Sequence, residues 1–505
     1  MSPGRAGRME SRAIRGSAAG MASLLLGLAT ALIQVPLLLR FWQAEEYGVW
    51  VSLLAALSLV TVFDAGHQAY VGNEIAKAWG HHRDRVRPLL ASGLRTALWV
   101  AMAELGLGAV LVFTGNLPAL LGQRAGGGDY GATAAFLLYL LFWGTFGSGG
   151  GILARLYPPA GLYARGEWLG VINRSAAFLA LAAACLAGAN LFGAMAAQVL
   201  VGVLFNLYFF LDLRRRLPAL FPWWKGGNLR TGFSNLRASL FLTANSLLDQ
   251  AAGNGLVLVV TAFLSPVQAG LLATQRTLAN LAQQGSAVFL NPVGADLARY
   301  HGTGQGGKIR GVFSVGWAAG HSLTAAGVIA AAPFLGAAYG SWTQGKFTFD
   351  PALFAWLGTA VVLRNWAAPF QLYLSNINSL KSQLAIGLAR GGVCLGTSLA
   401  LVPPMGVQGV GAGLLAGETA GALAGWLAAE RRLNESGARI PGGAAFRGLL
   451  QVGAVGVALA CLCLGGAVAM VATVAALTSI VGIGFLQWRW LEPGLQKRIL
   501  SLVRR

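Results

Sequence analysis

The sequence predicts an all-α polytopic membrane protein, and three observations support that prediction. Of its 505 residues, 56% are hydrophobic and only 11% are charged, whereas soluble domains carry about 25% charged residues. The apolar residues form long blocks, such as 96–114 and 175–211, which reach the roughly 20 residues that a helix needs to cross a bilayer. These blocks do not alternate in polarity, as the strands of a membrane β-barrel would.

The apolar blocks predict fourteen transmembrane helices. The run from about Ala18 to Leu39 is too long for the apolar region of a cleaved signal peptide, so it becomes the first span. We place the spans at 17–39, 47–66, 90–114, 131–155, 169–188, 190–212, 237–264, 266–296, 310–337, 351–376, 381–402, 406–429, 447–465 and 467–488.

The charge distribution predicts the side of the membrane that each loop faces. The net charge of +20 would indicate a nucleic-acid partner in a soluble protein. Here Lys and Arg gather in short loops such as 83–87 and 214–216, as they do in the cytoplasmic loops of membrane proteins. With the N-terminus inside, only Arg40, Arg124 and Lys346 fall outside. We therefore expect both termini in the cytoplasm and no nucleic-acid partner.

An internal repeat predicts two related halves. Residues 71–80 (VGNEIAKAWG) and 293–302 (VGADLARYHG) share four identical positions and three conservative exchanges. Six predicted spans separate the copies, so both halves should enter from the same side and be related by an axis along the membrane normal. The predicted organisation is an N-lobe (1–213), a basic cytoplasmic linker (214–236), a C-lobe (237–430), a cytoplasmic loop (431–446), and two further helices with a basic tail (447–505).

Three short motifs near the start resemble a known family. These are LRFWQAEEYG at 39–48, FDAG at 63–66 and NEIA at 73–76. They resemble the polysaccharide transporters of the multidrug/oligosaccharidyl-lipid/polysaccharide (MOP) exporter superfamily, which includes flippases for O-antigen and related lipid-linked oligosaccharides.

The resemblance carries several expectations. It implies two six-helix lobes around a central cavity, two additional helices, and alternating access in the bacterial inner membrane. The implied cargo is a polyprenyl-pyrophosphate-linked oligosaccharide for surface polysaccharide (O-antigen, lipopolysaccharide) biosynthesis. The implied partners are membrane lipids, a polysaccharide polymerase and glycosyltransferases.

Charged residues in the middle of predicted spans are the candidate cavity residues, because an ionisable group at the bilayer centre costs on the order of 3 kcal/mol. One interpretation is internal salt bridging, with Asp249 and Arg276 on consecutive spans as the obvious pair. The other is recognition of an anionic cargo, because a guanidinium group stays charged and its planar fork matches phosphate oxygens. The candidate residues are Arg276, Arg364, Arg390, Asp249, Glu418 and Glu104.

Other residues are candidates for gating. Pro36 should kink the first span, and Arg40 and Asp64 lie with it near the ends of the first two spans as possible gate or hinge residues. For Asp64, at a helix end, a capping or ion-pair role is favoured over a role in transport. Arg95 lies near enough to the interface to extend its charge into water.

Residues of the fourth span and three aromatic rings complete the predictions. The glycines between 144 and 151 could break the span or pack it closely against a neighbour. Trp143, Trp356 and Trp366 could stack on sugar rings, although most tryptophans of such proteins anchor at the interface.

The function predicted from these observations is export of a lipid-linked oligosaccharide. An ion-coupled antiporter for organic cations on the same fold is the alternative. A membrane-embedded sugar-polymer enzyme is the third possibility, but the predicted external loops are too short for an aqueous catalytic site. We expect no enzymatic activity, no catalytic residues, no metal and no cofactor, since the cysteines lie in apolar blocks and no nucleotide-binding loop is present.

Overall fold

The computed structural model describes residues 3–123, 131–435, 437–489 and 496, with side chains for all of these except 3–19, 81, 285–296 and 298. The described chain is helical and has no strands, and each of the fourteen predicted spans falls on helix. The predicted all-α polytopic fold is therefore confirmed, and the chain is a multi-pass membrane protein.

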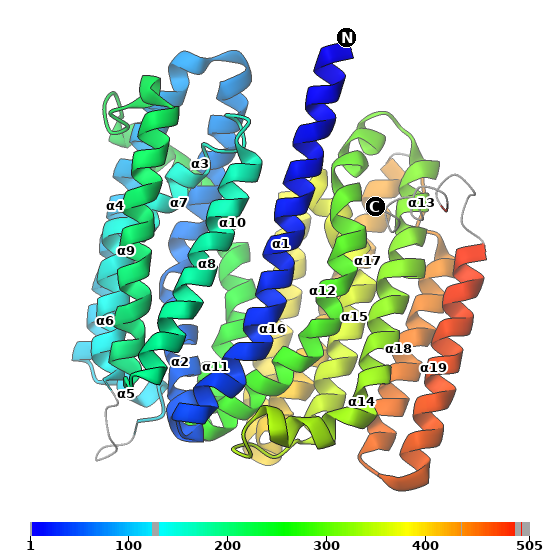
Figure 1. Cartoon of the computed structure of the whole chain (residues 1–505). Helices are drawn as coiled ribbons and strands as arrows, with labels where there is room; N and C mark the ends of the chain where they lie inside the picture. The colour runs from blue at the N-terminus through cyan, green and yellow to red at the C-terminus, as the bar shows by residue number, and fades with distance from the viewer. Residues whose placement is uncertain (1–2, 124–130, 436, 490–495, 497–505) are drawn as a thin grey trace. The chain divides into compact units, whose positions relative to one another are not determined.

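The chain divides into two compact units, residues 1–270 and 271–505. Their helices are drawn in Figure 1. The first unit contains α1 (Pro3–Phe41), α2 (Ala44–Val60), α3 (Val62–His81), α4 (Arg83–Phe113), α5 (Asn116–Leu120), α6 (Ala132–Phe142), α7 (Ser148–Ala154), α8 (Tyr163–Leu186), α9 (Leu191–Arg216), α10 (Leu229–Gln250), α11 (Leu256–Phe263) and the start of α12 (Pro266–Gly302). The second unit contains the rest of α12, then α13 (Gly306–Val315), α14 (Ser322–Trp342), α15 (Pro351–Asn376), α16 (Leu380–Met405), α17 (Val407–Glu435), α18 (Gly442–Leu462) and α19 (Gly466–Arg489).

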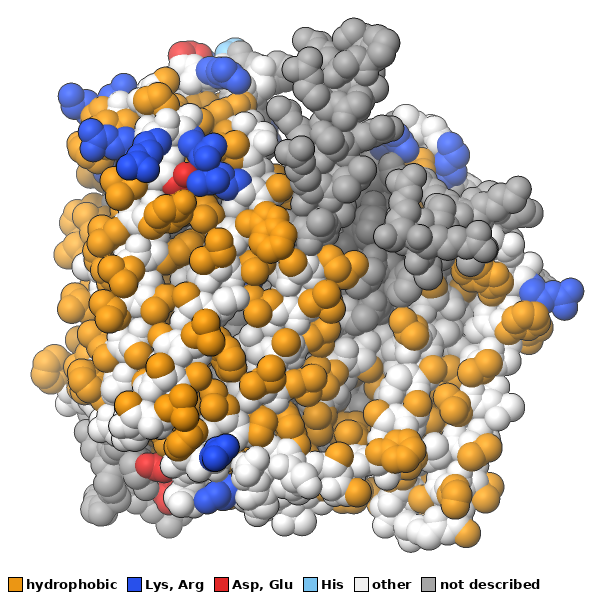
Figure 2. Space-filling model, viewed as in Figure 1, with side chains coloured by type: hydrophobic (Ala, Val, Ile, Leu, Met, Phe, Trp, Pro, Cys, Tyr) orange, Lys and Arg blue, Asp and Glu red, His pale blue; other side chains and the backbone are white. Residues whose placement is uncertain are grey.

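Most of these helices are long and apolar enough to cross a bilayer. Within the described residues, ten single helical segments meet that requirement, and α2 with residues 62–80 of α3 meets it only as a pair bent by 48°, the geometry of a broken span or a re-entrant loop. The other three predicted spans, α12, α15 and α17, are helices that are too polar to meet it. Figure 2 shows apolar side chains along the helices of the first unit, with most of the visible Lys and Arg gathered at one end.

The second predicted span is longer than expected. The sequence placed a loop after residue 66, but α3 continues to His81 and α4 begins at Arg83. Between 67 and 79 the chain has few helix breakers, and its polar residues can pair along the helix, as Glu74 and Lys77 do at 2.7 Å. Hydropathy located the apolar part of this helix and missed its amphipathic continuation.

Two expectations about helix breakers concern α1 and the fourth span. Pro36 lies inside α1, which is helical on both sides of it, and the kink expected there stays a prediction. The glycine-rich fourth span does break its regular pattern, because a π-helical turn at Trp143–Gly147 joins α6 to α7. Similar π turns occur at Ala251–Gly255 and Gly316–His321, and such turns are frequent at functional positions in helices.

The boundary between the compact units differs from the boundary expected between the lobes. The helix α10, from the seventh predicted span, packs against α3 and α4 of the first unit. It can do so because Gly66 has no side chain: a Cβ there would overlap the backbone of Thr243. The division into lobes related by rotation stays a prediction. The two copies of the repeat form the C-terminal ends of α3 and α12. The matched positions Ile75 and Leu297 are both fully buried.

The linker between α9 and α10 is folded against the first unit. Trp223 belongs to a buried cluster with residues such as Val71 and Phe209, and Phe221 packs against the same cluster. The irregular part of the linker is thus limited to 217–228, since α9 includes Arg216 and α10 starts at Leu229.

Candidate functional site

The second unit gathers four of the six candidate cavity residues. Arg364 on α15 approaches Glu418 on α17, with 3.9 Å between Nε and Oε1. The Glu418 side chain is only 9% exposed, whereas that of Arg364 is 43% exposed. Arg390 on α16 is buried. We call Arg276, Arg364, Arg390 and Glu418 the second-unit charge cluster.

Close packing of α16 on α17 positions Arg390. A Cβ on Gly417 would lie 2.7 Å from the Arg390 carbonyl oxygen and 3.0 Å from the Cys394 Cα. One turn later, a Cβ on Gly421 would lie 3.0–3.3 Å from the Arg390 side-chain carbons. Because glycines let helix backbones approach closely in a membrane, the Arg390 stem packs directly on Gly421 of α17.

The thiol of Cys394 lies close to three charged residues of the cluster. It interacts electrostatically with Glu418, Arg390 and Arg276. Arg276, on α12, also interacts with Arg364. Contacts and electrostatic interactions that run through Cys394, Arg276 and Glu418 therefore link charged groups from the four helices α12, α15, α16 and α17.

Four helices carry the charge cluster. Three of them, α12, α15 and α17, are the helices described above as too polar to be recognised as membrane spans by length and composition. Each of these three helices carries one charged residue of the cluster, namely Arg276, Arg364 or Glu418. In chemical terms, fixed guanidinium groups can hold phosphate oxygens through paired N–H donors at little reorganisation cost.

The first unit holds a second constellation, built from Asp64 and Glu104. The backbone N–H of Asp64 donates to Glu104 Oε1 at 3.1 Å, and the two side chains are almost completely buried. Gln68 Nε2 donates to Asp64 Oδ2 at 2.6 Å, and Trp143 Nε1 donates to Glu104 Oε2 at 3.1 Å. The π turn of the fourth span therefore supplies Trp143 to a carboxylate pair.

These contacts bear on several predictions from the sequence. Asp64, expected at a gate, lies buried in the first turn of α3. Arg40 is exposed in the last turn of α1. Asp249 lies on α10 in the first unit, so its pairing with Arg276 stays a prediction.

Two side chains have structural roles that the sequence did not predict. Trp366, considered as a platform for sugar rings, is buried between Trp317 and Trp426, which stack on it at 6.4 and 5.7 Å between ring centroids. That expectation is wrong, because the ring has no free face. Arg95 is not simply extended into water, since it donates to the carbonyl oxygens of Gly227 and Trp224.

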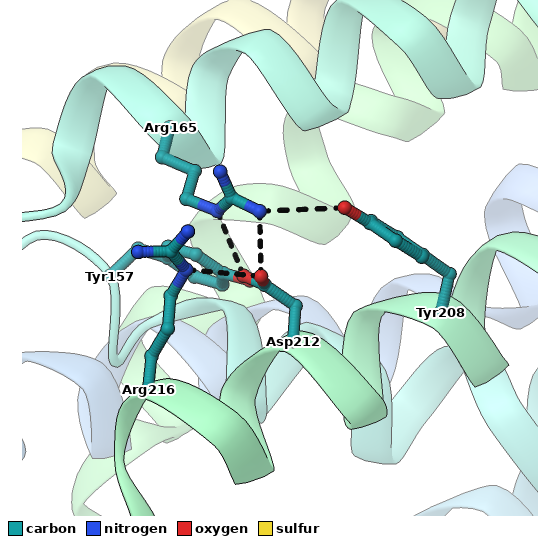
Figure 3. A network of polar contacts seen from close by, with 5 residues as sticks. All are labelled: Tyr157, Arg165, Tyr208, Asp212 and Arg216. Atoms are coloured by element: carbon teal, nitrogen blue, oxygen red, sulfur yellow. Dashed lines mark hydrogen bonds and ion pairs between the residues drawn. The ribbon is translucent and has the colours of Figure 1, made fainter.

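The sequence also missed a polar network at one end of the first unit (Figure 3). Asp212 on α9 accepts hydrogen bonds from Arg165 at 2.6 and 3.0 Å, from Arg216 at 3.0 Å and from Tyr157 at 2.7 Å. Arg165 also reaches the Tyr208 hydroxyl at 3.4 Å. Burial, together with Asp212, raises the pKa of Tyr157, so its hydroxyl stays a donor. Only the spacing of Asp212 and Arg216, one helical turn apart, gave any signal in the sequence.

Comparisons with known proteins place the fold. The chain resembles an inward-facing multidrug resistance MATE family transporter of the MOP superfamily, at 14% identity and a TM-score of 0.63, over 82% of this chain and 95% of that chain. It resembles the lipid II flippase MurJ in an inward closed conformation, at 12% identity and a TM-score of 0.62, over 94% and 99%. It also resembles the Vibrio cholerae MATE transporter VcmN, at 13% identity and a TM-score of 0.59, over 85% and 98%.

No protein-family model and no curated protein matches the chain. The likeness in structure shows that the chain has the fold of MATE transporters and of the MurJ flippase.

Proposed function

We propose that the protein is a flippase of the bacterial inner membrane that exports a polyprenyl-pyrophosphate-linked oligosaccharide by alternating access, for O-antigen-type surface polysaccharide. The observation that carries this proposal is the second-unit charge cluster, in which three arginines meet one carboxylate. The arginines belong on the path of the cargo's headgroup.

The physical reason is the cost of moving a pyrophosphate through apolar surroundings. An unpaired buried charge costs many kcal/mol, so the headgroup needs compensating charge along its path. Lysine would supply charge alone, whereas arginine supplies charge and a fork of donors with fixed geometry. An exporter of organic cations would instead need carboxylates to dominate the same position.

The comparisons support this proposal at the level of the fold. The lipid II flippase matches 94% of this chain, whereas the MATE transporters described above match 82% and 85%. Both classes of transporter share this fold, so the choice of a flippase rests on the charge cluster.

The alternative, an ion-coupled antiporter for organic cations, rests on a different observation. The buried pair of Asp64 and Glu104 in the first unit supplies carboxylates of the kind that a cation or proton would use. This alternative predicts that the acids, and not the arginines, control transport.

A transport assay with both cargo classes separates the two functions. The purified full-length chain is reconstituted into vesicles, and movement of a fluorescent polyprenyl-pyrophosphate-linked sugar is measured beside efflux of a fluorescent organic cation. We expect the lipid-linked sugar to move, and Arg276→Ala or Arg364→Ala to slow it about 10- to 100-fold, because a hydrogen bond to a charged group contributes about 1.5–3 kcal/mol. Arg364→Lys should restore part of the rate, and Arg310→Ala, an exposed control, should change little.

Other results would contradict the proposal. Transport of the organic cation alone would establish the antiporter. Full transport of the lipid-linked sugar by a variant that lacks both Arg276 and Arg364 would remove the role given to the cluster. Loss of folded protein in either variant would assign that arginine to helix packing, and the Arg364→Lys variant, which retains the charge, would then test cargo recognition.

A further inference from the structure

The linker between α9 and α10 has a fixed conformation and an exposed outer face. Arg95 Nη1 donates to the Gly227 carbonyl oxygen at 2.5 Å, and Arg95 Nη2 donates to that of Trp224 at 3.3 Å. The backbone N–H of Asn228 donates to Ser92 Oγ at 2.9 Å. With Trp223 buried beneath it, the linker holds its neighbouring side chains outward in a defined arrangement.

This outer face carries several basic side chains but only one nearby acidic side chain, Asp212, among the linker residues and those drawn in Figure 3. Asp212 already accepts four hydrogen bonds from Arg165, Arg216 and Tyr157 (Figure 3). Arg214 and Arg215, at the end of the same helix, and Lys225 in the linker are exposed. Figure 2 shows Lys and Arg gathered at this end of the first unit.

Aromatic side chains lie among these cations. The guanidinium carbon of Arg214 lies 4.6 Å from the centroid of the Phe221 ring, and the Trp224 side chain is 54% exposed. An exposed tryptophan next to basic residues at the end of a membrane-spanning helix is typical of the lipid headgroup region. Leu229 and Phe233 continue the apolar surface on α10, at 40% and 47% exposure.

We propose that Arg214, Arg215, Phe221, Trp224 and Lys225, which we call the linker face, bind the phosphate headgroup of an anionic phospholipid in the adjacent leaflet. The cations contact the headgroup oxygens, and the rings lie at the level of the glycerol backbone. This site lies on a single unit and is independent of the cargo. It fixes the end of the first unit at the membrane surface.

Lipid retention by the purified full-length chain tests the proposal. Native mass spectrometry measures binding of phosphatidylglycerol and of phosphatidylcholine with the same acyl chains. The wild type should prefer phosphatidylglycerol. The variant R214Q/R215Q/K225Q should bind it about 100-fold more weakly, because each surface cation contributes about fivefold. The control R310Q/R431Q/R439Q removes the same charge from exposed positions of the second unit and should change binding less than about twofold.

Trp224→Ala and a competition with inorganic phosphate identify the source of the anion. We expect Trp224→Ala to weaken phosphatidylglycerol binding and phosphate to displace the lipid poorly. If Trp224→Ala has no effect and phosphate displaces the lipid fully, the face binds free anions and the lipid assignment is overturned. Equal losses of phosphatidylglycerol binding in the two triple variants would also overturn the lipid assignment, as would a wild type that binds the two lipids equally. A protein partner would then be the candidate ligand of this face. Lys225→Gln alone gives the same test should the triple variant misfold.

Discussion

Replacing Glu418 with Gln separates an anionic cargo from a cationic one more sharply than any change to the arginines. Glutamine keeps the shape of the side chain and removes its charge. Glu418 is buried and approaches Arg364 to 3.9 Å. In a flippase for a pyrophosphate-linked lipid, this carboxylate competes with the headgroup for the arginines. In an organic-cation antiporter, it would attract the cargo.

The structure sets the size of the effect. Two unit charges 3.9 Å apart interact by about 4 kcal/mol at an effective dielectric constant of about 20. Because 43% of the Arg364 side chain is exposed, water screens the pair to about 1 kcal/mol. We therefore expect Glu418→Gln to bind the anionic cargo up to about fivefold more tightly. Loss of a buried carboxylate that pairs with a cationic cargo would cost about 2 kcal/mol or more, which is at least about thirtyfold.

The assay is concentration-dependent transport in vesicles, which separates the apparent affinity from the maximal rate. Glu435→Gln provides the control, since Glu435 is an exposed carboxylate on the same helix, paired with Arg432 at 2.9 Å. Equal or tighter binding of the lipid-linked sugar by Glu418→Gln is the expected result. If Glu418→Gln abolishes transport of that sugar while remaining folded, the reasoning about the charge cluster is refuted.

Three further predictions concern packing and topology. Gly417→Ala should destabilise the protein by about 1–3 kcal/mol through overpacking of α16 against α17, while Gly425→Ala, which has ordinary contact distances, should have little effect on thermal unfolding. Asp212→Asn should lower the unfolding temperature and make it less sensitive to salt than in the wild type, because it removes the charge that two arginines share; an unchanged melting curve would mean that water replaces these contacts. Reporter fusions after residue 216 should report the cytoplasm and those after residue 345 the periplasm, and a reversed pair would refute the predicted orientation.

The sequence predicted the helices well where composition alone decides them. Apolar length located a helix at each of the fourteen predicted positions, and most of the described helices there are long and apolar enough to cross a bilayer. It failed at 67–81, where α3 continues as a helix with polar residues. The kink expected at Pro36 stays a prediction, since α1 is assigned as one helix on both sides of that residue.

Side-chain environments were less predictable. Trp366 was a candidate for stacking on sugar rings because of its residue type, but its ring is buried and two other tryptophans stack on it. The network around Asp212 brings together Tyr157 and Arg165 from outside α9. Such contacts depend on how helices rotate about their axes, which apolar length does not determine.

The amino-acid sequence by itself thus determined that the chain is a helical membrane protein and that Arg276, Arg364, Arg390 and Glu418 lie within its spans. Only the tertiary structure decided that these residues meet, because their meeting requires α16 and α17 to approach at Gly417 and Gly421 and to present particular faces to α12 and α15. Span positions follow from transfer of local segments into lipid, whereas a shared site follows from packing between segments far apart in the chain.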